Sequence, residues 1–444
     1  MSVWLYLMSR TLFGTDGVRG IAGQYPLDAT GSFKIGCAVG THFAESGQSV
    51  VLGYDPRESS EEIALNLIAG LNQVGVNVVN MGVLPTPAIS YLTREHQEFV
   101  AGIMITASHN PYNFNGVKVF DSGGDKLPDS TEAALNDLID TEVPGRGQGT
   151  EKSEPSLLKQ YEQFLVNSAG ESKLDGLSIA IDSANGAASG IAQRVFETLG
   201  AKVTAICDKP DGRNINDECG ATNTKRLAEL VVREQLSFGI ALDGDADRLF
   251  FIDAQGREFN GDNIMYVLAA VGEYDGVVAT VMSNLGFEQA LYKKGIKLER
   301  TKVGDRYVLE GLEKTNYKLG GEQSGHIILP DLLKTGDALL AAVQLVKAVT
   351  SSRRTLEQWH DEVTMLPQAI VNIALHDKAL LETNEVKQFI KAQTERLGDD
   401  GRILIRPSGT EPLVRVMIEA PDAQHLAQTV AKDLQSIIKE LEQA

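Results

Sequence analysis

A single pattern occurs three times in the first two thirds of this chain, and it restricts the fold more than any other feature. Each copy has an apolar run, an amphipathic stretch, a glycine and a second apolar run. The copies are Val50–Asp55, 61–74, Gly75 and Val76–Val79; Leu177–Asp182, 187–199, Gly200 and Ala201–Ile206; and Val277–Met282, 287–294, Gly295 and Ile296–Arg300. Glycine is typical of helix C-termini. Each copy therefore predicts a strand, a helix and a second strand parallel to the first.

Each copy is followed by one more strand-like run that leads into a polar loop. The runs and loops are Val100–Ile105 before Thr106–Pro111, Phe238–Leu242 before Asp243–Arg248, and Tyr317–Leu319 before Gly320–His326. Ligands of open α/β sheets bind beyond the carboxyl ends of the strands. We therefore expect the three loops to meet at one cleft.

The predicted fold is α/β: three similar α/β domains with mixed, mostly parallel sheets, plus a smaller C-terminal α+β domain, around a central cleft. The last domain is predicted from strands at 368–375, 402–405 and 413–419 and a helix at 423–441. Predicted boundaries are 1–155, 156–256, 257–367 and 368–444. The stretch 141–156, which is rich in glycine and proline, is predicted to be a linker.

Composition excludes several classes of protein. The chain has 444 residues, with 60 Asp and Glu against 41 Lys and Arg, a net charge of −19. This balance argues against a nucleic-acid partner and against an anionic membrane surface. No apolar run approaches the ~18 residues of a membrane helix. The start, 1–8, lacks the features of a signal peptide and is interpreted as a strand start or an extension, so a cytoplasmic protein is predicted. Cys37, Cys207 and Cys219 are too few for a disulfide framework and are predicted to be free thiols.

The strongest local signal is Asp243-Gly-Asp-Ala-Asp-Arg248, where three carboxylates alternate directly after an apolar strand. Carboxylates this close repel each other unless a cation lies between them. Oxygen ligands alone favour Mg²⁺ or Ca²⁺. The alternative is an acidic turn on a solvated face.

The other loops are less specific by themselves. Ser108 follows a buried strand, but serine alone is a weak nucleophile, and an ordinary turn is the favoured alternative for its loop. The loop Gly321–His326 offers donors and acceptors suited to a polyhydroxylated ligand, or else is a turn. The segment 402–410 combines arginines, hydroxyls and backbone amides into a predicted phosphate site, with Arg415 nearby.

Taken together, five motifs resemble the α-D-phosphohexomutase superfamily over essentially Arg10 to Ala444. The motifs are Phe13-Gly-Thr-Asp-Gly-Val-Arg-Gly20, the Ser108 loop, the Asp243 loop, the Gly321 loop and Arg406-Pro-Ser-Gly-Thr-Glu-Pro412. The resemblance implies four domains around a deep cleft. It also implies that Ser108 is phosphorylated and holds Mg²⁺ together with Asp243, Asp245 and Asp247.

The resemblance assigns further roles at matching positions. Arg19, Lys118 and His326 are implied as candidates for general acid/base work and charge stabilisation, while His109 and Arg248 would steady the phosphoserine loop. Glu322 and Ser324 would hold sugar hydroxyls. The non-reacting phosphate would be gripped by Arg406, Ser408, Gly409, Thr410 and Arg415.

Gln323 and the Phe13 motif resemble the branch of the superfamily that interconverts glucosamine 6-phosphate and glucosamine 1-phosphate. The implied route passes through a phosphoserine enzyme and glucosamine 1,6-bisphosphate, and feeds UDP-N-acetylglucosamine and cell-wall precursors. The alternatives are a phosphomannomutase/phosphoglucomutase of the same superfamily, a Mg²⁺-dependent sugar phosphatase, or a non-catalytic sugar-phosphate binder. The partner expected is a small phosphosugar; the oligomeric state is open, with a homodimer as one alternative.

Overall fold

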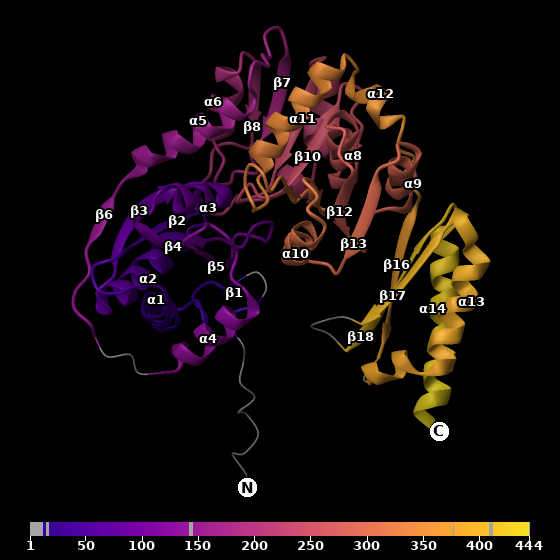
Figure 1. Ribbon diagram of the computed structural model, residues 1–444, viewed down its shortest axis with the longest axis horizontal. Helices are drawn as coiled ribbons and strands as arrows, with labels where there is room; N and C mark the ends of the chain where they lie inside the picture. Colours follow the sequence, from indigo (N-terminus) through magenta and orange to yellow (C-terminus); the bar gives the residue numbers. More distant parts are fainter. Residues whose placement is uncertain (1–11, 15–16, 142–144, 376, 408–411, 444) are drawn as a thin grey trace.

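The structure is a computed structural model that describes residues 12–14, 17–141, 145–375, 377–407 and 412–443. Four sheets follow one another along the chain and lie in an arc, with the first sheet at one end and the fourth at the other (Figure 1). Three α/β units with mixed sheets and a small C-terminal unit with an antiparallel sheet confirm the predicted fold class.

The first sheet has six strands in the order β1-β5-β4-β2-β3-β6. Its strands are β1 Val18–Ile21, β2 Ser49–Tyr54, β3 Asn77–Val83, β4 Phe99–Ile105, β5 Phe114–Asp121 and β6 Glu151–Ser153, and its helices are α1 Ala29–Phe43, α2 Ser60–Gln73, α3 Thr86–Glu95 and α4 Asp129–Ile139. As predicted, β2 lies parallel to β3, and it is also parallel to β4. The prediction of a plain linker at 141–156 is wrong in part, because β6 adds to the sheet parallel to β3.

The second sheet has the order β11-β10-β9-β7-β8, with β7 parallel to both β8 and β9. Its elements are η1 Pro155–Leu157, α5 Leu158–Ser168, β7 Ser178–Asp182, α6 Ile191–Thr198, β8 Lys202–Ile206, η2 Gly220–Thr222, α7 Lys225–Arg233, β9 Phe238–Leu242, β10 Leu249–Asp253 and β11 Glu258–Phe259. Helix α6 begins later than predicted because Gly190, with φ of 72°, has a left-handed backbone immediately before it.

The third sheet has the order β13-β12-β14-β15. Its elements are α8 Gly261–Val271, β12 Gly276–Thr280, α9 Leu285–Lys293, β13 Lys297–Thr301, α10 Asp305–Thr315, β14 Gly320–Gly321, β15 Ile327–Ile328, α11 Ala338–Ser352 and α12 Leu356–His360. The strand predicted at 317–319 is instead the short β14, because Asn316 ends α10 with a left-handed φ of 59° and a turn must follow.

The fourth sheet is antiparallel, in the order β16-β18-β17. Its elements are β16 Gln368–Ala374, η3 Lys378–Glu382, α13 Asn384–Leu397, η4 Gly398–Asp400, β17 Arg402–Pro407, β18 Leu413–Glu419 and α14 Ala423–Gln443. Buried Glu419 ties this unit to the third, because it accepts a hydrogen bond of 2.9 Å from the Leu285 amide. Within its own unit, Glu419 accepts a hydrogen bond of 3.0 Å from Arg402 Nε.

The glycines predicted to end the three repeated helices have the expected backbone. Gly75, Gly200 and Gly295 have φ of 81°, 104° and 75°, values that cost other residues more than glycine. Each glycine turns the chain into the strand parallel to the one before the helix. The helix therefore packs against the sheet, and the polar loops are left at the carboxyl ends of the strands.

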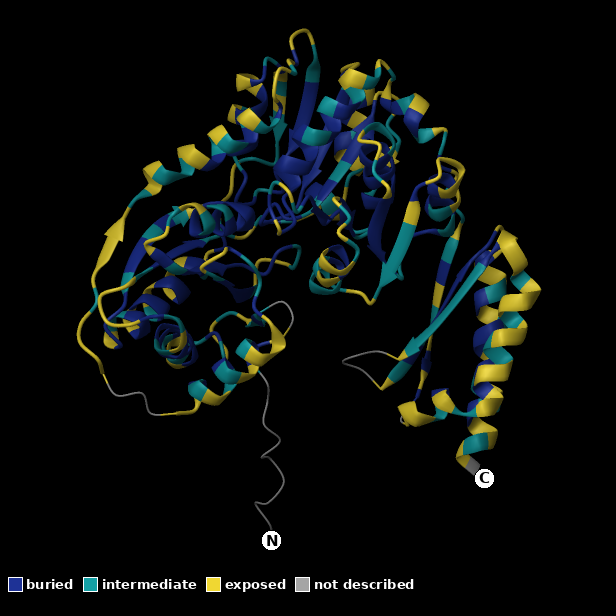
Figure 2. Ribbon diagram, in the orientation of Figure 1, coloured by how far each residue is buried: buried dark blue, intermediate teal, exposed yellow. Residues whose placement is uncertain are grey.

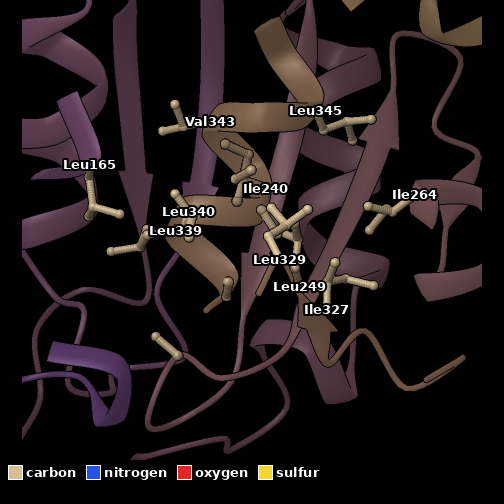
Figure 3. Close-up of a cluster of buried hydrophobic side chains, with 14 of the residues drawn as sticks. Leu165, Ile240, Leu249, Ile264, Ile327, Leu329, Leu339, Leu340, Val343 and Leu345 are labelled. Carbon is tan, nitrogen blue, oxygen red and sulfur yellow. The ribbon is translucent and has the colours of Figure 1, made fainter. Parts of the chain in front are cut away.

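Burial is concentrated in the central strands of the first three sheets, which are dark in Figure 2, while β6 and the outer helix faces are exposed and β13 and β17 are mostly intermediate. One apolar cluster continues from the second sheet into the third (Figure 3). Helix α11 supplies Leu339, Leu340, Val343 and Leu345 to it, beside Ile240 of β9. The C-terminal unit has an apolar cluster of its own between its sheet and α14. Among the described helices, none combines the length and the apolar character needed to cross a membrane.

Candidate active site

Ser108 lies where the first and second units meet. It follows β4, is 1% exposed, and holds a left-handed backbone with φ of 52°. Its Oγ donates a hydrogen bond of 2.7 Å to Asp243 Oδ2, just after β9. A non-glycine residue in this conformation is uncommon and marks a site that the surrounding structure constrains. Two of the loops predicted to meet are thus in direct contact.

A buried ion pair that the sequence reasoning missed fixes the backbone of the Ser108 loop. Arg57 Nε donates to Asp55 Oδ2 at 2.8 Å, and both side chains are fully buried. Arg57 Nη2 donates to the carbonyls of Ser108 and Asn110, each at 2.9 Å. Asp55 also accepts from Thr106 Oγ1 at 2.7 Å. The available signal was Asp55-Pro-Arg57 at the end of a predicted strand, where buried charges must be paired.

The second unit holds the same loop from the other side. Asn216 Nδ2 donates to the Ser108 carbonyl at 2.9 Å and to the Asn110 carbonyl at 3.2 Å. Asn216 itself has φ of 58°. The Ser108 backbone is therefore fastened by side chains from two units. Asn216 carries no motif in the sequence, so only the packing of the units identifies it.

The carboxylates of Asp243, Asp245 and Asp247 lie within 4.8 Å of one another, and all three residues are buried. Asp243 Oδ1 accepts hydrogen bonds from the amides of Asp247 and Arg248, both at 3.1 Å. Among the described residues, nothing donates a hydrogen bond to Asp245 Oδ1 or Asp247 Oδ1. Buried oxygens without donors fit a hard divalent cation, because such cations take oxygen ligands.

Lys118 partly balances the three carboxylates. Its Nζ donates to Asp245 Oδ2 at 2.7 Å and to Asp247 Oδ2 at 2.9 Å. Burial raises the pKa of Asp243 well above its ordinary value, and the charges of Asp247 and Asp245 raise it further. Burial also acts to raise the pKa of Asp247, but Lys118 and His326 outweigh it and hold that pKa well below its usual range. Arg248 and His326 also lie beside Asp247, so the donor-free carboxylate oxygens, rather than the net charge of the cluster, are what fit a metal site.

The third unit reaches the carboxylates through His326, which is 4% exposed. Its Nδ1 lies 3.8 Å from Asp247 Oδ1, and its Nε2 lies 3.3 Å from Asp305 Oδ2. Arg248 Nε lies 3.9 Å from Asp247 Oδ1. All three predicted loops therefore converge on one point.

His109 and Arg19 flank Ser108 from its own unit. His109 Nδ1 is 3.3 Å from Ser108 Oγ. Burial, followed by the charges of Arg248 and Arg19, lowers the pKa of His109 to about 4, so the imidazole is neutral at neutral pH. Arg19 Nη1 donates to the Ala107 carbonyl at 3.2 Å. Both residues thus lie at the Ser108 loop.

A cavity of about 490 Å³ lies beside this cluster, lined by Arg248, Met282, Glu322, Gln323 and Ser324 among others. Glu322 Oε1 accepts a hydrogen bond from the Gly304 amide at 3.1 Å. Ser324 Oγ is buried, and the described residues offer it no hydrogen-bond partner. The predicted sugar-binding residues therefore face a space of the size that small ligands occupy.

The C-terminal unit contributes two arginines near the wall of this cavity. Arg406 of β17 and Arg415 of β18 are directly opposite in the antiparallel ladder, so their side chains share a face. Arg406 Nη2 lies 3.7 Å from Sδ of Met282, which lines the cavity. Burial and the charge of Arg415 lower the pKa of Arg406. Ser408, Gly409 and Thr410 lie outside the described residues.

Comparisons with known proteins agree with this geometry. Four family models match in chain order: phosphoglucomutase/phosphomannomutase alpha/beta/alpha domain I at 10–145, domain II at 158–256, domain III at 260–365 and the C-terminal domain at 370–434. A phosphoglucosamine mutase 2 of Shewanella amazonensis is 44% identical, covering 94% of this chain and 96% of its own. A phosphoglucosamine mutase of Thermus thermophilus is 43% identical, covering 98% and 99%.

Solved structures share the fold. A phosphoglucomutase/phosphomannomutase family protein of Burkholderia thailandensis superposes with a TM-score of 0.81 at 24% identity, over 97% of this chain and 98% of that one. An N-acetylphosphoglucosamine mutase of Aspergillus fumigatus, solved with GlcNAc-6P and magnesium, gives 0.62 at 18% identity, over 91% and 99%.

The four-unit fold and the site between its units define a phosphohexomutase. The chain belongs to the α-D-phosphohexomutases, the phosphoglucomutase/phosphomannomutase family. It is an isomerase of that family, as the sequence motifs indicate.

Proposed function

We propose that this phosphohexomutase is a phosphoglucosamine mutase, which interconverts glucosamine 6-phosphate and glucosamine 1-phosphate. The observation that carries the proposal is the similarity to phosphoglucosamine mutases, at 42–44% identity over nearly the whole chain in three relatives. Gln323, which lines the cavity beside Glu322 and Ser324, is the position at which the motif resembles this branch of the family.

Ser108 is proposed as the residue that carries the phosphoryl group. In the forward half-reaction, the bond between phosphorus and Ser108 Oγ breaks, and a bond from phosphorus to O1 of glucosamine 6-phosphate forms. The proton of the O1 hydroxyl passes to a general base, for which Lys118, His326 and Arg19 are the candidates, and Ser108 Oγ takes up a proton as it leaves. The product of this step is glucosamine 1,6-bisphosphate.

In the second half-reaction the bisphosphate has turned around in the cavity. The bond between phosphorus and O6 breaks as a bond from phosphorus to Ser108 Oγ forms, the Oγ proton passes to the general base, O6 takes up a proton, and glucosamine 1-phosphate leaves. Because Ser108 Oγ is 2.7 Å from Asp243 Oδ2 and its loop is fixed by Arg57 and Asn216, the acceptor oxygen is held in place for both directions.

Asp243, Asp245 and Asp247, together with the phosphate on Ser108, would hold Mg²⁺, and the bound ion would neutralise charge at the transferring phosphoryl group. The support is the set of buried carboxylate oxygens without donors. His109 and Arg248 would steady the phosphoserine loop. Lys118 pairs with Asp245 and Asp247, so it maintains the balance of charge around the transferred group.

The rest of the substrate is proposed to lie in the cavity. Glu322 and Ser324 would bind sugar hydroxyls, and Arg406, with Arg415 opposite it, would bind the non-reacting phosphate. Ser408, Gly409 and Thr410 are proposed to complete that phosphate site. Guanidinium groups suit this task because they bind phosphate in a bidentate manner.

The test is a side-by-side measurement of kcat/KM for the 6-phosphates of glucosamine, glucose and mannose, with intact mass before and after phosphatase treatment. We expect the highest value for glucosamine 6-phosphate, and one phosphoryl group lost on phosphatase treatment. A higher value for the glucose or mannose substrate would favour a phosphoglucomutase/phosphomannomutase instead. Release of inorganic phosphate without an isomeric product would contradict both activities.

A further inference from the structure

Two of the three cysteines lie together outside the active site. Cys207 directly follows β8, Cys219 precedes Gly220, and Asp182 ends β7. The two thiol sulfurs and an Asp182 carboxylate oxygen lie within 4.8 Å of one another. The prediction of free thiols is confirmed, since all three cysteines are free in the structure. No sequence pattern indicates that two of them would be neighbours.

The two thiols have different surroundings. Cys219 is 1% exposed, whereas Cys207 is partly exposed. Arg226 Nη1 lies 3.6 Å from Cys207 Sγ. A hydrogen bond from Cys219 lowers the pKa of Cys207; burial and the Asp182 carboxylate act to raise it, and Arg226 adds a smaller lowering effect. A reachable thiol beside a cation, with a buried thiol next to it, is the arrangement of an oxidisable pair.

The segment between these cysteines carries a contact of the active site. Asn216 lies within it and donates to the carbonyls of Ser108 and Asn110. Next to Cys219, Gly220 packs closely on the end of β9: a Cβ there would lie 2.3 Å from the carbonyl oxygen of Leu242. Leu242 is the residue before Asp243. A shift of Cys219 would therefore reach both the Ser108 loop and the metal-site loop.

We propose that Cys207 and Cys219 are a peroxide-sensitive thiol pair whose disulfide loosens the Asn216 contact with Ser108 and lowers mutase activity reversibly. The Cys207 thiolate attacks one oxygen of hydrogen peroxide, the O–O bond breaks, and protonation of the released hydroxide gives water and a sulfenic acid. The Cys219 thiol then displaces the sulfenic hydroxyl, which leaves as a second water when the S–S bond forms. A dithiol reductant reverses the change by thiol–disulfide exchange.

Cys207, Cys219 and Asp182 could also be metal ligands, since thiolates and carboxylates bind zinc. The guanidinium of Arg226 beside Cys207 opposes a bound cation and favours a thiolate. The Asp182 carboxylate acts in the opposite direction, so the choice of oxidation over metal binding rests on Arg226 together with the partial exposure of Cys207. The experiment separates the two outcomes.

The first measurement is independent of catalysis. The full chain is treated with hydrogen peroxide, denatured and alkylated, and its peptides are mapped. We expect the reduced protein to be alkylated at all 3 cysteines, and the oxidised protein at Cys37 alone, with Cys207 linked to Cys219. Absence of this link, or zinc retained by the purified protein and lost in Cys207→Ser, would overturn the proposal.

The second measurement follows the consequence. Hydrogen exchange of the segment around Ser108 should increase on oxidation and return after reduction. Mutase activity of the wild type should fall at least severalfold on oxidation. The activity measurement rests on the proposed function, whereas the disulfide mapping and the hydrogen-exchange measurement do not. In peroxide, Cys219→Ser and Cys207→Ser should keep the hydrogen exchange and the mutase activity of the untreated protein. Cys37→Ser should respond to peroxide as the wild type does. Equal inactivation of Cys207→Ser and the wild type would refute the coupling.

Discussion

Ser108 Oγ and Asp243 Oδ2 are joined by a hydrogen bond of 2.7 Å, although the two residues are 135 positions apart in the chain. The serine belongs to a loop after β4 and the aspartate to a loop after β9, so the contact exists only because two sheets pack with their carboxyl ends together. Any change in how the first two units meet acts directly on this pair.

Replacing the hydroxyl tests the phosphoserine proposal. Ser108→Ala should reduce kcat by a factor of about a thousand or more, because the proposed mechanism transfers the phosphoryl group through the Ser108 hydroxyl. The phosphopeptide containing position 108 should disappear from the mass map. Ser32→Ala is the matched control, since Ser32 is also buried in the first unit but lies in α1; its activity should remain. Full turnover by Ser108→Ala would exclude the mechanism.

Removing one carboxylate tests the metal site. Asp247→Asn should raise the Mg²⁺ concentration for half-maximal activity about tenfold or more. Mg²⁺ should also raise the Tm of the wild type, because a ligand that binds only the folded state stabilises it. This rise should be absent in Asp247→Asn and retained in Glu229→Gln, which changes an exposed carboxylate on α7. An unchanged Mg²⁺ response in Asp247→Asn would place the metal elsewhere.

The C-terminal arginines are expected to act mainly on substrate binding. Arg406→Ala should raise KM about tenfold to a hundredfold, which corresponds to the loss of charged hydrogen bonds worth ~1.5–3 kcal/mol. Arg406 and Arg415 are opposite each other in the sheet. The double variant Arg406→Ala with Arg415→Ala should therefore lose less substrate-binding free energy than the sum of the losses in the two single variants. Arg396→Ala, on an exposed position of α13, is the control. A KM that stays at the wild-type value would remove Arg406 from the phosphate site.

A pH effect on stability is expected from a buried carboxyl next to the catalytic cluster: the amides of its neighbours Gly336 and Ala338 donate to His326 Nε2 and to the Ala246 carbonyl. Asp337 caps α11, accepts a hydrogen bond from Tyr161 Oη at 2.9 Å, and is fully buried. Burial raises the pKa of Asp337 from 3.8 to about 7. Between these values the unfolded carboxyl loses its proton while the folded one keeps it, so the free energy of unfolding falls as pH rises.

Asp337→Asn removes this titration and keeps the shape of the side chain. Stability of the wild type relative to Asp337→Asn should decline by on the order of a few kcal/mol between about pH 4 and about pH 7. Chemical denaturation at a series of pH values measures the difference. Asp275→Asn, an exposed position in the third unit, should follow the wild-type profile. If the free energy of unfolding of the wild type and of Asp337→Asn changes with pH in parallel, the Asp337 carboxyl of the folded protein is ionised over this whole pH range.

Local sequence signals were enough to predict the repeated strand–helix–strand units. The apolar runs at 50–55 and 76–79 predicted β2 and β3, and Gly75 marked the turn between helix and strand, because backbone propensity and hydrophobic periodicity act over short distances. The same reasoning failed at β6, since nothing in Glu151–Ser153 indicates a strand until β3 offers a free edge. It also misplaced β14, which depends on where α10 ends.

The sequence by itself determined the fold class, the polar loops, and the residue types at Ser108 and at the three aspartates. Only the tertiary structure decided that Arg57 and Asn216 hold the Ser108 loop, that Lys118 balances the aspartates, and that Cys207 lies beside Cys219. These contacts join residues far apart in the chain, and no local pattern encodes which surfaces of two packed units will meet. Buried charges and donors then pair with whatever that packing brings within reach.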